Sequence, residues 1–169
     1  MHLRNAQEAD RGQIRDITLA AYEEYAATVP ASFWTAYRGN LLTTLESSGP
    51  EERIVAEQDG VIVGSVLLYP PAAGAYGSAV GAGESPEVRL LAVLPAARGE
   101  GVGRALMEEC VRRARVAGAA ALGLHTMDMM HAAVRMYERM GFKRVPEADF
   151  SPGGGVLVKA YRLDLLEAA

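Results

Sequence analysis

The stretch LAVLPAARGEGVGRAL, residues 91–106, constrains the fold most, because it leads from an apolar, strand-like run into a helix through three glycines, Gly99, Gly101 and Gly103. Glycine inside a helix costs about 1 kcal/mol relative to alanine, so this spacing needs a compensating reason. A helix N-terminus exposes unpaired N–H groups and a positive partial charge, and glycines let an anion approach that backbone closely. The stretch therefore predicts a strand–turn–helix unit that binds phosphate, with an ordinary glycine-rich loop as the alternative.

Two familiar phosphate-binding loops fit this stretch poorly. A P-loop requires lysine and then serine or threonine after its last glycine, whereas Gly103 is followed by Arg104 and Ala105. The dinucleotide fingerprint G-x-G-x-x-G, counted from Gly101, would place its third glycine at Leu106. The acidic ribose contact that should follow about 20 residues later is also missing.

Composition narrows the class of protein. The length of 169 residues fits one domain, 1–169, and a net charge of -4 provides no general basic surface for nucleic acid. Residues 61–83 are uncharged, but only VIVGSVLLY is strongly apolar, so we expect a buried strand rather than a membrane span. The lone Cys110 excludes an internal disulfide, and three histidines without a pair at ligand spacing predict no metal site. With no secretory signal at the N-terminus, we expect a cytoplasmic protein.

Periodicity and turn signals predict the order β-α-α-β-β-β-α-β-α-β-β. Helices are expected over about 9–25, from about 32, from the glycine stretch to about 117, and over about 129–140. The last of these has Asp128 as its N-cap and Gly141 as its stop. Strands are expected near 1–5, over 53–69 as a hairpin turning at Asp59-Gly60, and near 87–94, 121–126, 142–145 and 156–163. Hairpins combined with a strand–helix–strand unit predict an α/β (α+β) fold with a mixed sheet.

The glycine stretch resembles the signature of the GNAT superfamily, the acyl-CoA-dependent N-acyltransferases. That signature, Q/R-x-x-G-x-G/A at the start of the central helix, corresponds to Arg98-x-x-Gly101-x-Gly103. The preceding strand EVRLLAV, residues 87–93, is also similar to the family strand.

A second family motif strengthens the resemblance. The late-helix pattern A-x-x-x-Y-x-x-x-G-F occurs as Ala133, Tyr137, Gly141 and Phe142, about 35 residues after the first motif. Two motifs in the correct order are far more specific than either alone. The resemblance implies a GNAT-like mixed, mostly antiparallel central sheet with a splayed parallel strand pair and helices on both faces. The order of elements fits nearly the whole chain, although the first 50 residues match only in pattern.

The resemblance also implies a binding site for acetyl-CoA as co-substrate. Backbone amides of the glycine stretch would hold the pyrophosphate, and the strand before it would pair with the pantetheine arm beside a bulge. An N–H near Val93 would then polarise the thioester carbonyl. The implied cofactor-binding residues are Leu91, Ala92, Val93, Arg98, Gly99, Gly101, Val102, Gly103 and Arg104.

The implied catalytic residues are Tyr137 and Glu87. Tyr137 resembles the family tyrosine that protonates the leaving sulfur, although its position on an apolar stripe also fits a core tyrosine. Glu87 matches the strand glutamate that acts as base in several relatives, with His125, Glu84 or a water chain as alternatives. Met130 stands where the family often has an asparagine that contacts pantetheine, which removes one polar anchor.

The acceptor side should be formed by the first two helices and the loop 70–86. Its aromatic and acidic candidates are Tyr22, Glu23, Tyr25, Trp34 and Tyr37, and their helical spacing also fits core positions. We therefore expect an enzyme that transfers acetyl from acetyl-CoA to a primary amine of a small molecule or peptide. Direct attack on the thioester needs no acyl-enzyme, so Cys110 is expected only to pack. The alternatives are a non-catalytic acyl-CoA-binding regulatory module and a structural interaction domain, and a homodimer is left open.

Overall fold

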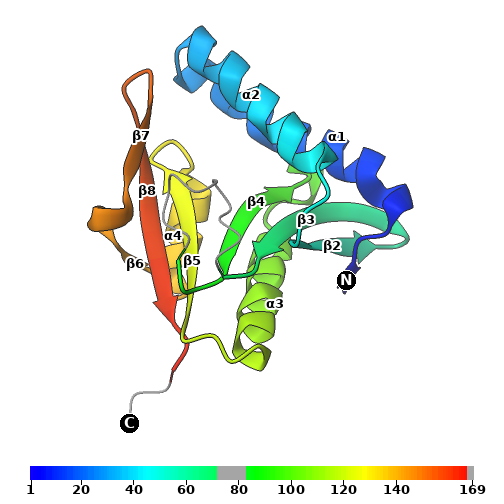
Figure 1. The fold of residues 1–169 in the computed structure, drawn as a ribbon. Helices are drawn as coiled ribbons and strands as arrows, with labels where there is room; N and C mark the ends of the chain where they lie inside the picture. The colour runs from blue at the N-terminus through cyan, green and yellow to red at the C-terminus, as the bar shows by residue number, and fades with distance from the viewer. Residues whose placement is uncertain (72–82, 167–169) are drawn as a thin grey trace. The chain divides into compact units, whose positions relative to one another are not determined.

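The computed structural model describes residues 1–71 and 83–166 (Figure 1). The helices are α1 (Arg11–Tyr22), α2 (Ala31–Glu46), α3 (Val102–Val116) and α4 (His131–Arg139). The strands are β1 (His2–Asn5), β2 (Glu52–Gln58), β3 (Val61–Tyr69), β4 (Glu87–Val93), β5 (Ala121–Met127), β6 (Lys143–Arg144), β7 (Phe150–Gly153) and β8 (Val156–Asp164). Their hydrogen-bonded order is β1-β2-β3-β4-β5-β8-β6, with β7 paired to β8. The pair β4–β5 is parallel, whereas β1–β2, β2–β3, β5–β8 and β6–β8 are antiparallel, which confirms the mixed, mostly antiparallel α/β (α+β) fold.

The chain forms two compact units. The first contains residues 1–68 and 90–109, and the second contains residues 69–89 and 110–169. The boundaries fall inside β4 and inside α3, so each of these elements contributes to both units. The expectation of one domain over 1–169 stays a prediction.

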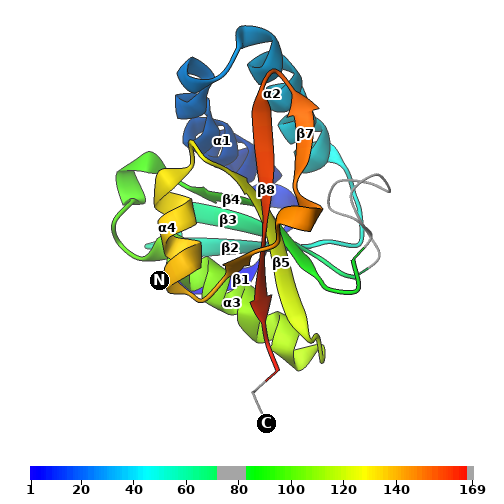
Figure 2. The same cartoon turned by 90° about the vertical axis from the view of Figure 1, so that its left-hand side faces the viewer.

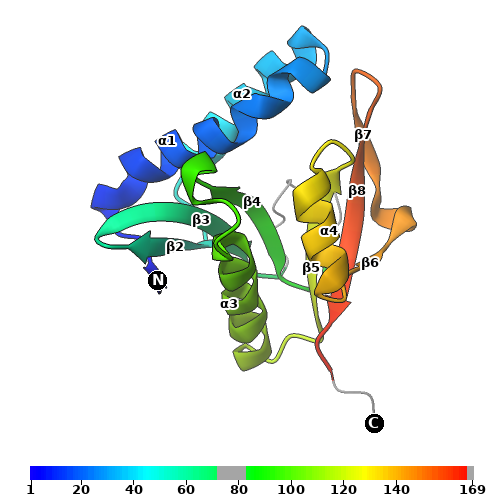
Figure 3. The ribbon, with the colours of Figure 1, turned by 180° about the vertical axis from the view of Figure 1, so that it is seen from behind.

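The first unit is built on a tight hairpin packed against a helix. Asp59 and Gly60 have φ of 51° and 79°, the two positive angles that a two-residue hairpin turn requires, which confirms the predicted turn. Gly64 of β3 lies under α3, and a Cβ there would be 2.8 Å from the Val102 side chain and 3.1 Å from the carbonyl of Ala92. Glycine at this position therefore lets the helix that carries the predicted phosphate site lie directly on the sheet. The hairpin and the start of α3 are visible in Figure 3.

The second unit places α4 on one face of β5 and β8, as Figures 2 and 3 both show. Tyr161 of β8 donates a hydrogen bond to Glu138 of α4 at 3.2 Å, and a Cβ on Gly141 would contact Leu163 at 3.4 Å. Because successive strand residues point to opposite faces, Ala160 and Arg162 lie on the face away from α4. That face carries the site described below.

Three local expectations are wrong or incomplete. Asp128 is not the N-cap of α4, because the helix begins at His131 after Met130, and the Asp128 carboxylate instead accepts a hydrogen bond from Lys159 Nζ at 2.6 Å. The first helix ends at Tyr22 and continues as a 3₁₀ segment, Glu23–Thr28. Strand β7 was not predicted, because its sequence FSPG has little strand propensity; the strand forms by pairing with β8.

The expected ends of two helices and the burial of Cys110 are confirmed. Gly118 and Gly141 follow α3 and α4 with φ of 77° and 94°, as helix C-terminal glycines should. Cys110 is fully buried. Among the helices of the described residues, none combines the length and apolar character needed to cross a membrane.

Candidate functional site

The first unit contains the predicted strand–turn–helix element. Gly99 and Gly101 have φ of 82° and 80°, and a Cβ at either position would meet no other group within 4 Å. The helix α3 begins at Val102, and Ala105 N–H donates to the carbonyl of Gly101 at 3.0 Å. The amides of the glycine turn and of the first turn of α3 lie before this bond. Amides at that end of an α-helix have no carbonyl partner within the helix. The turn is thus open, and its conformation favours glycine, which fits an anion held by backbone N–H groups.

The arginines that flank the turn are held by carboxylates. Arg98 pairs with Glu24 at 2.7 Å and also donates to the carbonyl of Ala21 at 3.2 Å. Arg104 pairs with Glu108 one helical turn later, also at 2.7 Å. The Arg98 pair is partly exposed and the Arg104 pair is more exposed. In each pair the carboxylate offsets the charge of the arginine, so the backbone amides are the main source of positive potential at the turn.

Strand β4 departs from extended backbone at Leu90, within the strand in which the resemblance implied a bulge. Leu90 has a φ of 54°, a left-handed conformation that is rare for a leucine in a strand. Beyond it, the carbonyl of Leu91 accepts a hydrogen bond from the Tyr22 hydroxyl at 3.0 Å, and Leu94 N–H donates to Val63 at 2.8 Å. These bonds fix the end of β4 that leads into the glycine turn.

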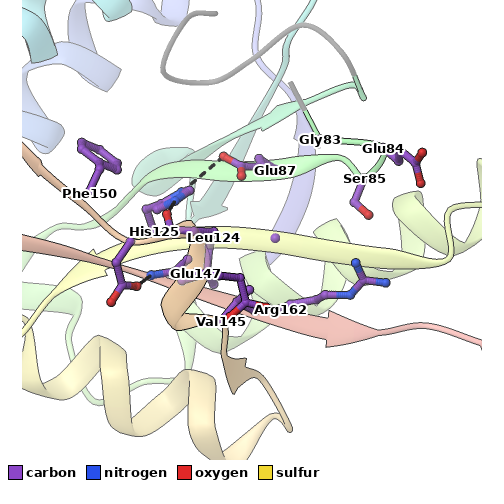
Figure 4. Close-up of a pocket in the computed structure, with 14 residues that line it drawn as sticks. Gly83, Glu84, Ser85, Glu87, Leu124, His125, Val145, Glu147, Phe150 and Arg162 are labelled. Carbon is purple, nitrogen blue, oxygen red and sulfur yellow. Dashed lines mark hydrogen bonds and ion pairs between the residues drawn. The ribbon is translucent and has the colours of Figure 1, made fainter. Parts of the chain in front are cut away.

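The second unit brings Glu87 and His125 together, as Figure 4 shows. Their Oε2 and Nδ1 atoms lie 3.6 Å apart, and the His125 Nε2 atom lies 3.1 Å from the carbonyl of Ala148. A carbonyl oxygen only accepts hydrogen bonds, so this contact assigns a proton to Nε2. The other ring nitrogen, Nδ1, faces the Glu87 carboxylate. The His125 side chain is only 4% exposed, whereas that of Glu87 is 22% exposed and can be reached from solvent.

These two residues lie on the wall of a pocket of about 480 Å³. It lies on the face of β5 and β8 that α4 does not cover, and it is lined by Gly83, Glu84, Ser85, Glu87, Gly123, Leu124, His125, Val145, Glu147, Ala148, Asp149, Phe150, Ala160 and Arg162. This volume lies in the usual range for small-molecule sites. Sequence reasoning found Glu87, Glu84 and His125 but missed Arg162 and the wall around Phe150, which no local motif marks.

An ion pair fastens the pocket wall to β8. Arg144 donates twice to Asp149, at 2.7 and 2.6 Å, and Asp149 also accepts the N–H of Ala160 at 2.8 Å. The Arg144 guanidinium is the main reason that the pKa of Asp149 falls from 3.8 to about 2. Phe150 follows directly and packs edge-on against the ring of His125, with ring centroids 5.4 Å apart. The pair therefore helps to hold the histidine in place.

Tyr137 is not brought next to Glu87. It is 6% exposed and packs against Phe142, on the helix that covers the opposite face of β5 and β8. The two predicted catalytic residues therefore lie on opposite faces of these strands, and their roles stay predictions.

The predicted acceptor residues of the first two helices form an aromatic cluster in the first unit. Tyr22 is buried and has Tyr25 and Tyr37 as ring neighbours at 6.0 and 6.3 Å, and Trp34 lies 6.1 Å from Tyr37. Burial raises the pKa of Tyr25 above its usual value. Glu23 opens the 3₁₀ segment after α1. The loop 70–86, also expected on the acceptor side, lies mostly outside the described residues.

A mixed sheet with a left-handed residue in β4, followed by an open glycine turn at the start of α3, is the arrangement that the resemblance to the N-acyltransferases led us to expect. The model of the Acetyltransferase (GNAT) family matches residues 13–142, and the chain belongs to this family, which makes it an acyltransferase.

Individual relatives agree with this assignment. The chain is 29% identical over 150 residues to an IAA acetyltransferase of Azospirillum brasilense, covering 88% of this chain and 92% of the relative. Among solved structures, it is similar to yncA, a putative acetyltransferase from Salmonella typhimurium determined with its cofactor acetyl-CoA. The TM-score is 0.65 at 23% identity, covering 100% and 96% of the two chains. The ribosomal-protein-S18-alanine N-acetyltransferase from Escherichia coli has a TM-score of 0.69 at 17% identity, covering 99% and 96%.

Proposed function

We propose that this protein transfers the acetyl group of acetyl-CoA to a primary amine of a small molecule or peptide. The observation that carries the proposal is the open turn of Gly99 and Gly101, with φ of 82° and 80°, at the N-terminus of α3. Such a turn suits a pyrophosphate, because amides and helix dipole converge where no side chain intervenes. The similarity to a structure that contains acetyl-CoA supports this choice of co-substrate.

The residues present fit the coenzyme. The amides of residues 98–104 hold the pyrophosphate, and Arg98 and Arg104 add charge at its edges. The contact residues in this proposal are Leu91, Ala92, Val93, Arg98, Gly99, Gly101, Val102, Gly103 and Arg104. The backbone of β4 after Leu90 aligns the pantetheine arm, with an N–H near Val93 directed at the thioester oxygen. Bound acetyl-CoA supplies an acetyl group activated as a thioester.

Glu87 and Tyr137 divide the proton transfers. As the new N–C bond forms and the C–S bond breaks, the nitrogen must lose a proton and the sulfur must gain one. Glu87 takes the proton from the nitrogen, directly or through water, and His125, 3.6 Å away, forms the pocket wall beside it. Tyr137, on the opposite face of β5, gives its phenolic proton to the sulfur. Protons are conserved, because solvent returns the tyrosine proton and receives the one from Glu87.

The whole chain acts in this proposal as one catalytic domain, 1–169, in the cytoplasm. A non-catalytic acyl-CoA-binding regulatory module is the second candidate. It would share the glycine turn but would need neither the Glu87–His125 pair nor the pocket beside it.

Acetyl-CoA titration and thiol release with an amine panel test the proposal together. Gly101→Glu should abolish coenzyme binding, because it places a carboxylate where the pyrophosphate sits. Gly60→Glu is a matched control, since Gly60 has nearly the same φ, 79°, and equally open surroundings, but lies in the hairpin turn. Unchanged affinity for acetyl-CoA in a folded Gly101→Glu variant would contradict pyrophosphate binding by the glycine turn. Coenzyme binding without thiol release from any amine would favour the regulatory module.

A further inference from the structure

The pocket of the second unit contains an arginine for which the proposed chemistry has no use. In the strand register, Glu87 pairs with Gly123 on β5, and Gly123 pairs with Arg162 on β8. Residues directly opposite in a sheet point to the same face, so a carboxylate and a guanidinium stand on either side of a glycine. All three residues line the pocket.

The spacing of Glu87, Gly123 and Arg162 across three neighbouring strands fits a small ligand with two charges. Neighbouring strands lie about 4.8 Å apart, so the Cα atoms of Glu87 and Arg162 are about 10 Å apart. Figure 4 shows Glu87 turned toward His125, whereas Arg162 extends in the other direction in this view. The pocket thus has an acidic end at Glu87, where the proton of the acceptor amine must be removed, and a basic end at Arg162. Gly123, which has no side chain, lies between the two ends.

Gly123 leaves space between these two ends of the pocket. A Cβ at this position would lie 3.4 Å from Glu87 Cγ and 3.5 Å from Glu87 Oε1. These are ordinary contact distances, so a methyl group would fit the fold but would fill space beside the carboxylate. Glycine in a strand often marks a place where a ligand approaches the backbone closely.

Arg162 suits the recognition of a carboxylate. Its side chain is 51% exposed, and its Nε atom donates to Asp164 at 3.1 Å. The two Nη groups are not part of that bond, and they form the edge of the guanidinium that can bind a carboxylate through two hydrogen bonds. The pocket also contains Asp149, but Arg144 already neutralises that carboxylate. Glu84 and Glu147 are further exposed carboxylates of the pocket lining.

Resting on the proposed function, we propose that the pocket binds the acceptor as a zwitterion, with its ammonium group at Glu87 and its carboxylate at Arg162. The acceptor class is therefore free amino acids and small amino-carboxylic acids. Arg162 is a specificity-determining residue, and Gly123 sets the room available beside the nitrogen.

Matched acceptor pairs test this inference. Amino acids and ω-amino acids are each compared with the corresponding carboxamide, which keeps the amine and removes the negative charge. Wild type should favour the acids by about 10- to 100-fold in kcat/KM, the scale of a charge-assisted hydrogen bond. Arg162→Gln should lose that preference mainly through KM, while its rate with carboxamides stays near that of wild type. Arg115→Gln, an exposed arginine in the last turn of α3, is the charge-matched control.

A binding measurement separates this inference from the proposed function. NMR titration of the same pairs, without acetyl-CoA, should show tighter binding of acids by wild type and by Arg115→Gln, but not by Arg162→Gln. Gly123→Ala should remain folded and weaken binding of the acids. Preferential binding of acids without turnover of any amine would support the pocket assignment and contradict catalysis. Equal binding of acids and carboxamides by wild type, or no binding of either, would overturn the zwitterion assignment whatever the activity.

Discussion

Asp149→Asn tests how the pocket wall is held. In wild type, both carboxylate oxygens of Asp149 accept hydrogen bonds from Arg144, and one also accepts the N–H of Ala160. The side chain is 14% exposed, so these bonds are poorly screened by water. Asparagine keeps one oxygen but presents an NH₂ group to the guanidinium, and two donors cannot bond to each other. The substitution therefore removes one of the two hydrogen bonds between Arg144 and residue 149. It also removes the negative charge of Asp149 that faces the guanidinium.

The pKa of Asp149 gives the scale of the effect. Its fall from 3.8 to about 2 corresponds to roughly 2 kcal/mol of preferential interaction with the ionised form. Because the folded-state value is the lower one, this stabilisation is fully present above pH 4. It disappears as the pH falls from about 4 toward 2. We expect Asp149→Asn to lower the free energy of unfolding by about 2 kcal/mol at pH 7, and the gap to wild type to narrow below pH 4.

Urea denaturation followed by circular dichroism at pH 7, 5 and 3 measures this gap. Asp128→Asn is the control, since Asp128 pairs with Lys159 at 2.6 Å but is 74% exposed, and such pairs contribute at most about 1 kcal/mol. A difference between Asp149→Asn and wild type that is below 0.5 kcal/mol at pH 7, on the order of a surface pair, would refute the reasoning. So would a difference that stays constant down to pH 3.

Four other substitutions give direct expectations. Tyr137→Phe keeps the ring packed on Phe142 and should leave acetyl-CoA affinity unchanged, but lower kcat by about 10²-fold if the phenol protonates the sulfur; full activity would contradict that role. Glu87→Gln should depress kcat/KM most at neutral pH, where the amine is protonated, and recover partly at higher pH; a pH profile identical to that of wild type would leave His125 or water as the base. Arg98→Ala should weaken acetyl-CoA binding, measured by calorimetry, by less than tenfold, because the backbone amides remain; loss of all binding would make the side chain dominant. Gly64→Ala should cost about 1–3 kcal/mol in urea denaturation, because its Cβ would lie 2.8 Å from the side chain above it; unchanged stability would show that α3 shifts freely.

Local chemistry explains why much of the fold was predictable. The turn at Asp59-Gly60, the stop at Gly141 and the glycines before α3 each depend on backbone angles that few residues adopt, so the residue type itself signals the conformation. Errors arose where a residue had competing partners. Asp128 is a good N-cap in isolation, but in the folded chain it pairs with Lys159, and the helix begins three residues later.

The candidate site was predictable only in part. Glu87 and the glycine turn carry motifs, because their roles depend on fixed spacing along the chain. Arg162 carries none, since it meets Glu87 only through two strand pairings, across Gly123.

The sequence by itself determined the family, through two spaced motifs, together with the strand–turn–helix element and most helices and strands. Helices, strands and turns could be predicted because they depend on residues close in the chain. Only the tertiary structure decided which faces the side chains share. The register of β4, β5 and β8 puts Glu87, His125 and Arg162 on one face and leaves the α4 side to Tyr161 and Leu163. A shift of one residue in that register would exchange the two sets of side chains, and the register is set by pairing between strands that lie far apart in the chain.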